Sequence, residues 1–208
     1  FKKYRFIGLW FYGFTAIALS ILMSPFIELW IGNRMVVGAL TINLIVLDYY
    51  MIGQRICLNN IKSAAGVFEP DKYVAILQAI VNLVTSIIFV KLIGLPGVYV
   101  GTIIQGTRSS VLKPILSYKL LFGKSSKYYF VDSVRYGGTV LFAYIICYIL
   151  SKKVLENITV LSFSLMAILV VIIPNIVFAL VFYRSDEFKY LIGIVKSMTR
   201  KGQKMIGK

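Results

Sequence analysis

The sequence contains no histidine, only two cysteines and only eight acidic residues among its 208. The missing histidine removes the commonest general base at neutral pH and the commonest metal ligand. Cys57 and Cys147 are far apart and in no spacing typical of a metal or redox site, so we expect both to be small apolar residues. No nucleophile elbow or phosphate-binding loop is present, and we interpret Glu69 and Asp71, which flank Pro70, as part of an ordinary solvated loop. The sequence therefore predicts that the chain is not an enzyme and holds no cofactor and no metal.

Hydrophobic residues are abundant and lie in long uncharged blocks. They make up 59% of the chain, and the mean hydropathy is +0.82, whereas soluble domains average about 45–50% apolar residues. The net charge is +15. In a soluble protein this excess would indicate nucleic-acid binding, but nearly all the basic residues fall between the apolar blocks, where they would contact anionic lipid headgroups. We therefore expect a protein that contacts membrane lipids and no nucleic acid.

Six blocks are long enough to cross a membrane as helices, since a spanning helix needs about 20 mostly apolar residues. The first block closes near Ser24–Pro25, and the segment Gly94–Gly97 between the third and fourth suits a tight hairpin. The fifth block is the shortest, and it reaches full length if Arg135 extends to the membrane surface. The sequence thus predicts an all-α membrane protein with spans at about residues 6–27, 35–56, 73–93, 97–118, 133–151 and 157–183, which together form one unit over residues 1–185.

The basic residues predict the orientation of these spans. If the segment before the first span is cytoplasmic and the sides alternate, 19 of the 23 basic residues lie inside. The four that remain outside are Arg34, Lys91, Lys152 and Lys153. Because cytoplasmic loops carry an excess of Lys and Arg, we expect both ends of the chain to be cytoplasmic.

The tail, residues 186–208, has a different pattern. Its apolar residues recur at helical spacing, and basic residues occupy much of the rest of the helix surface, which is typical of a helix that lies on a membrane leaflet. The alternative is a frayed basic tail that only fixes the topology. The apolar residues are Phe188, Leu191, Ile192, Val195 and Met198.

Two charged residues fall near the middle of predicted spans. The helical rise places Asp48 about 20 Å into the second span and Arg108 about 16 Å into the fourth, within a hydrocarbon core of about 30 Å. Since charges at this depth normally face a cavity or a partner, we hypothesise that Arg108 lines a water-accessible path for an anionic substrate. Asp48 would hold Arg108 in place or bind a coupling ion. The alternatives are a structural ion pair between the two, or an Arg108 that reaches the cytosolic headgroups.

Other polar residues form stripes on the predicted spans. Gln78, Asn82 and Ser86 lie four residues apart on the third span, and Gln105 belongs to a stripe on the fourth that also contains Thr102, Ser109 and Lys113. Such stripes face protein or water, so Gln78, Asn82 and Gln105 are candidates for the substrate path, and hydrogen bonding between helices is the alternative. Arg55 is a further candidate, although its place at the cytosolic end of the second span already follows from the topology.

Several short motifs occur in the order found in one transporter family. The chain carries Ser24-Pro-Phe-Ile-Glu-Leu-Trp-Ile-Gly32, Phe68-Glu-Pro-Asp-Lys-Tyr73, Ile80-Val-Asn-Leu-Val84, Ile87-Ile88 and Gly94-Leu-Pro-Gly-Val-Tyr-Val-Gly-Thr102. This order resembles the bacterial Wzx-type polysaccharide flippases, of the multidrug/oligosaccharidyl-lipid/polysaccharide transporter superfamily. The resemblance covers residues 24–102, about two fifths of the chain.

The resemblance implies a transporter of two six-helix lobes, of which this chain is the C-terminal half. Its first residue is Phe1 rather than Met, and we interpret the chain as part of a longer protein. Wzx-type members move undecaprenyl-pyrophosphate-linked oligosaccharide repeat units across the bacterial cytoplasmic membrane for O-antigen, lipopolysaccharide or capsule biosynthesis. The implied partners are this lipid-linked oligosaccharide, the N-terminal half of the same transporter and a polysaccharide polymerase. Arg108 and Arg55 would provide the cationic lining that a pyrophosphate cargo needs, and Asp48 would be the coupling-ion candidate.

Three other functions remain open from the sequence. A multidrug or cation antiporter of the same superfamily would need an anionic cavity to attract its substrates. A flippase for the lipid precursor of peptidoglycan is a close relative of the favoured function. A membrane scaffold that transports nothing would need no continuous hydrated path.

Overall fold

The computed structural model describes the backbone of residues 1–66 and 69–206, and the side chains of residues 1–66 and 75–197. The described backbone contains helices and no strand, so the expected all-α class is confirmed. The long helices are α1 (Lys2–Trp30), α2 (Ala39–Ala64), α3 (Glu69–Ile93), α4 (Leu95–Ser117), α5 (Lys127–Val154), α6 (Val160–Phe182) and α7 (Asp186–Ile206). A 3-10 turn, η1 (Asn33–Met35), precedes α2, and a π-helical turn, η2 (Tyr118–Phe122), follows α4.

Four of these helices are long and apolar enough to cross a membrane by length and composition. They are α1, the part of α3 from Ala75 to Ile93, α5 and α6. Four such helices in one chain point to a membrane protein. α2 and α4 occupy the expected second and fourth positions, but both carry charged residues among their apolar ones, so their composition differs from that of the other four.

The helices extend beyond several of the expected boundaries. The first span is expected to close near Ser24–Pro25, and α1 continues as a helix through Pro25 to Trp30. A proline removes one backbone hydrogen bond, and a helix packed within a protein tolerates that loss. The expected fifth span, residues 133–151, lies inside a much longer helix, α5, because flanking polar residues continue the helix beyond the apolar block.

The core lies where α1, α5 and α6 pack together. Its fully buried side chains come from all three helices, and they include Leu9 of α1, Cys147 of α5 and Phe178 of α6. Gly13 allows this close packing, since a Cβ there would lie 2.7 Å from Cγ2 of Val140. The buried position of Cys147 fits its interpretation as a small apolar residue.

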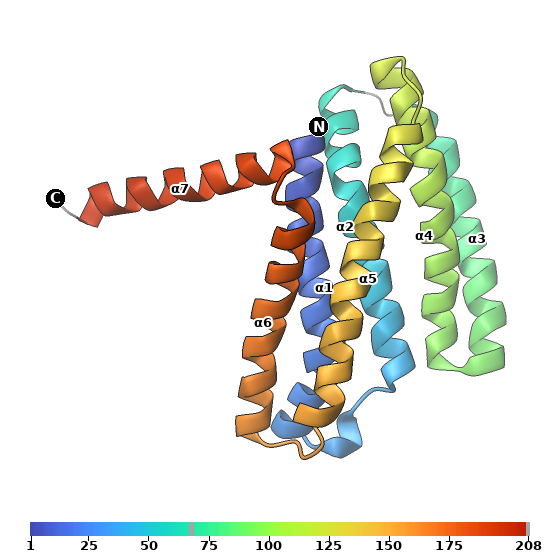
Figure 1. The fold of residues 1–208 in the computed structure, drawn as a ribbon. Coiled ribbons are helices and arrows are strands. Elements are labelled where there is room, and N and C mark those ends of the chain that lie inside the picture. Colours follow the sequence, from blue (N-terminus) through green and yellow to red (C-terminus); the bar gives the residue numbers. More distant parts are fainter. Residues whose placement is uncertain (67–68, 207–208) are drawn as a thin grey trace.

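The α3–α4 hairpin lies at the side of this core and joins it through contacts between α4 and α2 (Figure 1). Gly94 has a positive φ of 70° at the turn, a conformation that favours glycine. Gly97 and Gly101 then bring the two helices together, because a Cβ on Gly97 would lie 2.1 Å from the carbonyl oxygen of Phe89. The predicted hairpin at Gly94–Gly97 is therefore confirmed.

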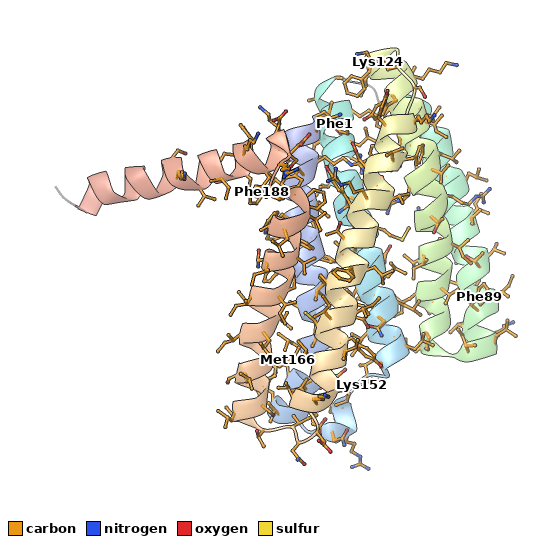
Figure 2. The ribbon with its side chains drawn as sticks, viewed as in Figure 1. Phe1, Phe89, Lys124, Lys152, Met166 and Phe188 are labelled. Carbon is orange, nitrogen blue, oxygen red and sulfur yellow. The ribbon has the colours of Figure 1, made fainter. Side chains whose placement is uncertain are left out.

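The chain enters α1 and leaves α6 at the same end of the bundle (Figure 1). From there α7 extends across the direction of the other helices. Its first turns are anchored on α1, where the ring of Phe188 stacks on Trp10 at 5.6 Å between centroids. Figure 2 labels Phe1 and Lys124 at this end and Lys152 at the opposite end. We refer to these as the Phe1 end and the Lys152 end.

Candidate functional site: a cationic groove between α2 and α4

A cavity of about 240 Å³ lies between α2 and α4, and nearly all the residues that line it are polar. Both helices run from the Lys152 end toward the Phe1 end, and each contributes residues three or four positions apart, which is the repeat of one helical face. We call this cavity the α2–α4 groove. Its lining residues are Asp48, Ile52, Arg55 and Asn59 of α2 and Thr102, Gln105, Ser109 and Lys113 of α4.

Arg55 joins the two walls of the groove. Its side chain is buried, with Nη1 donating a hydrogen bond to the Gly106 carbonyl oxygen at 3.1 Å and Nε donating to the Met51 carbonyl oxygen at 3.1 Å. Gly106 brings the α4 backbone into contact with both charged groups, since a Cβ there would lie 3.7 Å from Nη2 of Arg55 and 3.6 Å from Oδ1 of Asp48. The guanidinium is therefore held in one position by backbone atoms of two helices.

The charges along the groove are mostly positive. Asp48 is half-buried and attracts Arg55, whereas Lys113 lies close enough to Arg55 to repel it. Farther toward the Phe1 end, Lys62 of α2 is buried and lies close enough to Lys113 for the two charges to repel each other. The groove and its Phe1 end thus combine three cationic side chains with one carboxylate, which favours an anion.

Arg108 does not lie in this groove. It is exposed on α4, one residue and therefore about 100° around the helix from Ser109, which lines the groove. The expected juxtaposition of Asp48 with Arg108 is not formed, because Arg55 is the arginine that faces Asp48. Depth along a helix follows from residue number, but the rotation that turns one side chain inward depends on how the helices pack.

The polar stripes of α3 and α4 meet each other. Nε2 of Gln105 donates to Oε1 of Gln78 at 3.2 Å, and the hydroxyl group of Thr102 donates to Oδ1 of Asn82 at 3.5 Å. Gln78 and Asn82 thus contribute to the contact between the two helices, in accord with the alternative that assigned these stripes to interhelical hydrogen bonds. Gln105 takes part in both the contact and the groove wall.

Arg5, for which the sequence predicts only a place among the basic residues that orient the spans, is buried. It is 3% exposed, its Nη1 donates to the Tyr129 carbonyl oxygen at 3.0 Å, and its guanidinium lies 3.7 Å from the Tyr129 ring centroid. It also contacts Asp132 at 3.9 Å and the hydroxyl group of Ser133. In the sequence, the signal for this site is Asp132, one of only eight acidic residues, which lies three residues after Tyr129 and four before Tyr136.

Comparison with known proteins gives no match to a family model, to a curated protein or to a solved structure. The resemblance to Wzx-type flippases therefore rests on the short motifs in the sequence.

Proposed function

We propose that this protein is one lobe of a membrane transporter that flips lipid-linked oligosaccharides, with α1 to α6 as its six spans. α2 has 26 residues and α4 has 23, so at the helical rise they are about 39 Å and 35 Å long. Both lengths exceed a hydrocarbon core of about 30 Å. Of the charged residues that make these two helices less apolar, Asp48, Arg55 and Lys113 line the α2–α4 groove, whereas Arg108 is exposed on α4.

The observation that carries this proposal is the α2–α4 groove. Ionised groups in a membrane helix are costly unless they face a cavity, water or each other. Here Asp48, Arg55 and Lys113 share one polar cavity instead of lying on separate lipid-facing surfaces. A groove with two cations and one acid attracts an anionic group such as a pyrophosphate, and it disfavours the organic cations that a multidrug antiporter carries.

The motif order of residues 24–102 supports undecaprenyl-pyrophosphate-linked oligosaccharides as the cargo and alternating access against a second lobe as the mechanism. The excess of basic residues at the Phe1 end supports a cytoplasmic location for that end in the bacterial inner membrane. In this orientation α7 lies on the cytoplasmic leaflet, with Lys189 and Lys196 near anionic headgroups.

The test is deletion of the gene in a bacterium that uses it. We expect surface polysaccharide to be lost while its lipid-linked repeat units accumulate, and these units should be reachable only from the cytoplasmic side. Absence of the lipid-linked units would assign the protein to their synthesis instead. Unchanged polysaccharide, combined with a change in resistance to cationic drugs, would favour the antiporter.

A further inference from the structure

A second, mostly apolar groove runs along α1 between α2 and α5, on a different face of α2 from the α2–α4 groove. It consists of two adjoining cavities of about 320 Å³ and 200 Å³. The two cavities share Ser20 of α1, Asn43 of α2 and Tyr144 of α5, so they lie end to end along the bundle. α2 and α5 both pack on α1, which forms the floor.

This groove is long enough to cross one leaflet of a membrane. On α5 its lining extends from Gly137 to Lys152, which is about 22 Å at the helical rise. Half of a hydrocarbon core is about 15 Å thick. The groove therefore runs from the middle of the bundle to the membrane surface at the Lys152 end, and its outer edges are half-exposed leucines, Leu47 and Leu141.

The mouth of the groove carries a positive charge on an aromatic support. Tyr144, Tyr148 and Lys152 follow one another at intervals of four residues along α5 and all three line the groove. The two tyrosine rings stack at 5.8 Å between centroids, and Nζ of Lys152 lies 4.9 Å from the Tyr148 centroid. Tyrosine and lysine at a span end are typical of the depth at which lipid headgroups lie.

We infer that this groove binds one acyl chain of an anionic phospholipid from the leaflet at the Lys152 end, with the lipid phosphate held at Lys152. Apolar walls do not hold water well. A phosphate attached to a hydrocarbon chain complements this groove, because Lys152 lies at its mouth and the apolar walls lie behind. A phospholipid acyl chain crosses one leaflet, and this groove is long enough to hold it. A polyprenyl carrier chain of 55 carbons is far longer than the groove.

The test uses the full chain, purified and placed in nanodiscs of phosphatidylglycerol and phosphatidylcholine, with retained lipid measured by native mass spectrometry after transfer to detergent. We expect about one phosphatidylglycerol per chain. Lys152→Gln should lower its retention about tenfold through the lost charged contact, whereas Lys153→Gln, next in sequence and outside the groove lining, should not. Leu141→Trp should fill the groove and abolish retention of either lipid.

Equal retention by Leu141→Trp and the wild type, or equal effects of the two lysine substitutions, would overturn the assignment. Displacement of phosphatidylglycerol by an equimolar amount of polyprenyl phosphate would also overturn it, since the site would then belong to a carrier lipid. Thermal unfolding establishes whether each variant is folded. Leu47→Trp, at another half-exposed position of the groove, replaces Leu141→Trp if the latter does not fold.

Discussion

Arg55 and Arg108 lie at similar heights on neighbouring helices and have opposite surroundings. Arg55 is buried and bonded to the α4 backbone at Gly106, whereas Arg108, two residues along α4, is exposed. A substrate anion in the α2–α4 groove would meet Arg55 and Lys113 and would not meet Arg108. The two arginines therefore form a matched pair for testing which face of α4 serves transport.

Substitution of the groove cations should lower transport. We expect Arg55→Gln and Lys113→Gln each to reduce surface polysaccharide about tenfold or more, since a hydrogen bond to a charged group contributes about 1.5–3 kcal/mol. The variants are compared in cells that depend on the protein, with membrane abundance measured by immunoblot. Arg108→Gln is the control and should retain near-normal output. Loss of output in Arg108→Gln alone would move the substrate path to the exposed face of α4.

Arg5 should matter for stability rather than for transport. Its removal leaves Asp132 and Ser133 without their cationic partner and deletes a ring contact with Tyr129. We expect Arg5→Ala to lower the free energy of unfolding by about 2–4 kcal/mol. Thermal unfolding in detergent measures this effect, and Lys2→Ala, at an exposed position, should be close to the wild type. Similar melting temperatures for both variants would contradict a structural role for Arg5.

At the scale of elements, the α3–α4 hairpin is held together by small residues and polar side chains rather than by apolar burial. None of the side chains of residues 75–93 is fully buried, yet the helices approach closely at Gly97 and Gly101. The hydrogen bonds of Gln78 and Asn82 to α4 then fix the register of the two helices. Such packing is typical of membrane helices, because burying apolar side chains away from lipid provides little driving force for helix association.

A methyl group at Gly101 should push α4 away from α3 in the hairpin. Its Cβ would lie 2.6 Å from the backbone nitrogen of Ser86, so one helix has to shift. We expect Gly101→Ala to destabilise the protein by about 1–3 kcal/mol, as measured by thermal unfolding. Gly138→Ala of α5, where a Cβ meets nothing within 4 Å, should be neutral or slightly stabilising. Equal melting temperatures for the two variants would show that the hairpin tolerates this change.

α7 should lie at the membrane surface with one face in lipid. Spin labels on cysteines at Ile192 and Ser197, which are about 140° apart around the helix, sample its apolar and polar faces. In liposomes we expect the label at 192 to be relaxed mainly by oxygen and the label at 197 mainly by a water-soluble nickel chelate. Equal exposure of both labels to the nickel chelate would place α7 in water and favour the alternative of a basic tail.

At the scale of the whole molecule, the chain separates a three-helix core from a hairpin that carries one wall of the polar groove. α1, α5 and α6 form the core, and α2 connects it to α4 and α3. The polar groove thus lies away from the most tightly packed part of the protein. This arrangement lets the groove hold charged residues without placing them in the apolar core.

The orientation of the whole chain is tested by cysteine labelling in intact cells. Single cysteines at Lys2 and Lys189 should be protected from a membrane-impermeant maleimide, whereas cysteines at Asn33 and Asn157, in loops at the opposite end, should be labelled. Cys57 and Cys147 are buried and should give little background. Labelling at Lys2 without labelling at Asn33 would invert the orientation.

The sequence by itself determined the helical class, the approximate position of each helix, the Gly94 turn and the polar stripes. These features depend on local properties, because hydropathy and helical spacing are read along a single segment. Only the tertiary structure decided that Arg55 faces Asp48, that Gln78 meets Gln105 and that Arg5 is buried against Tyr129. In a helix that is apolar on most sides, the sequence leaves the rotation about the axis undetermined. That rotation is set when neighbouring helices pack, and it decides which charged side chain enters a cavity.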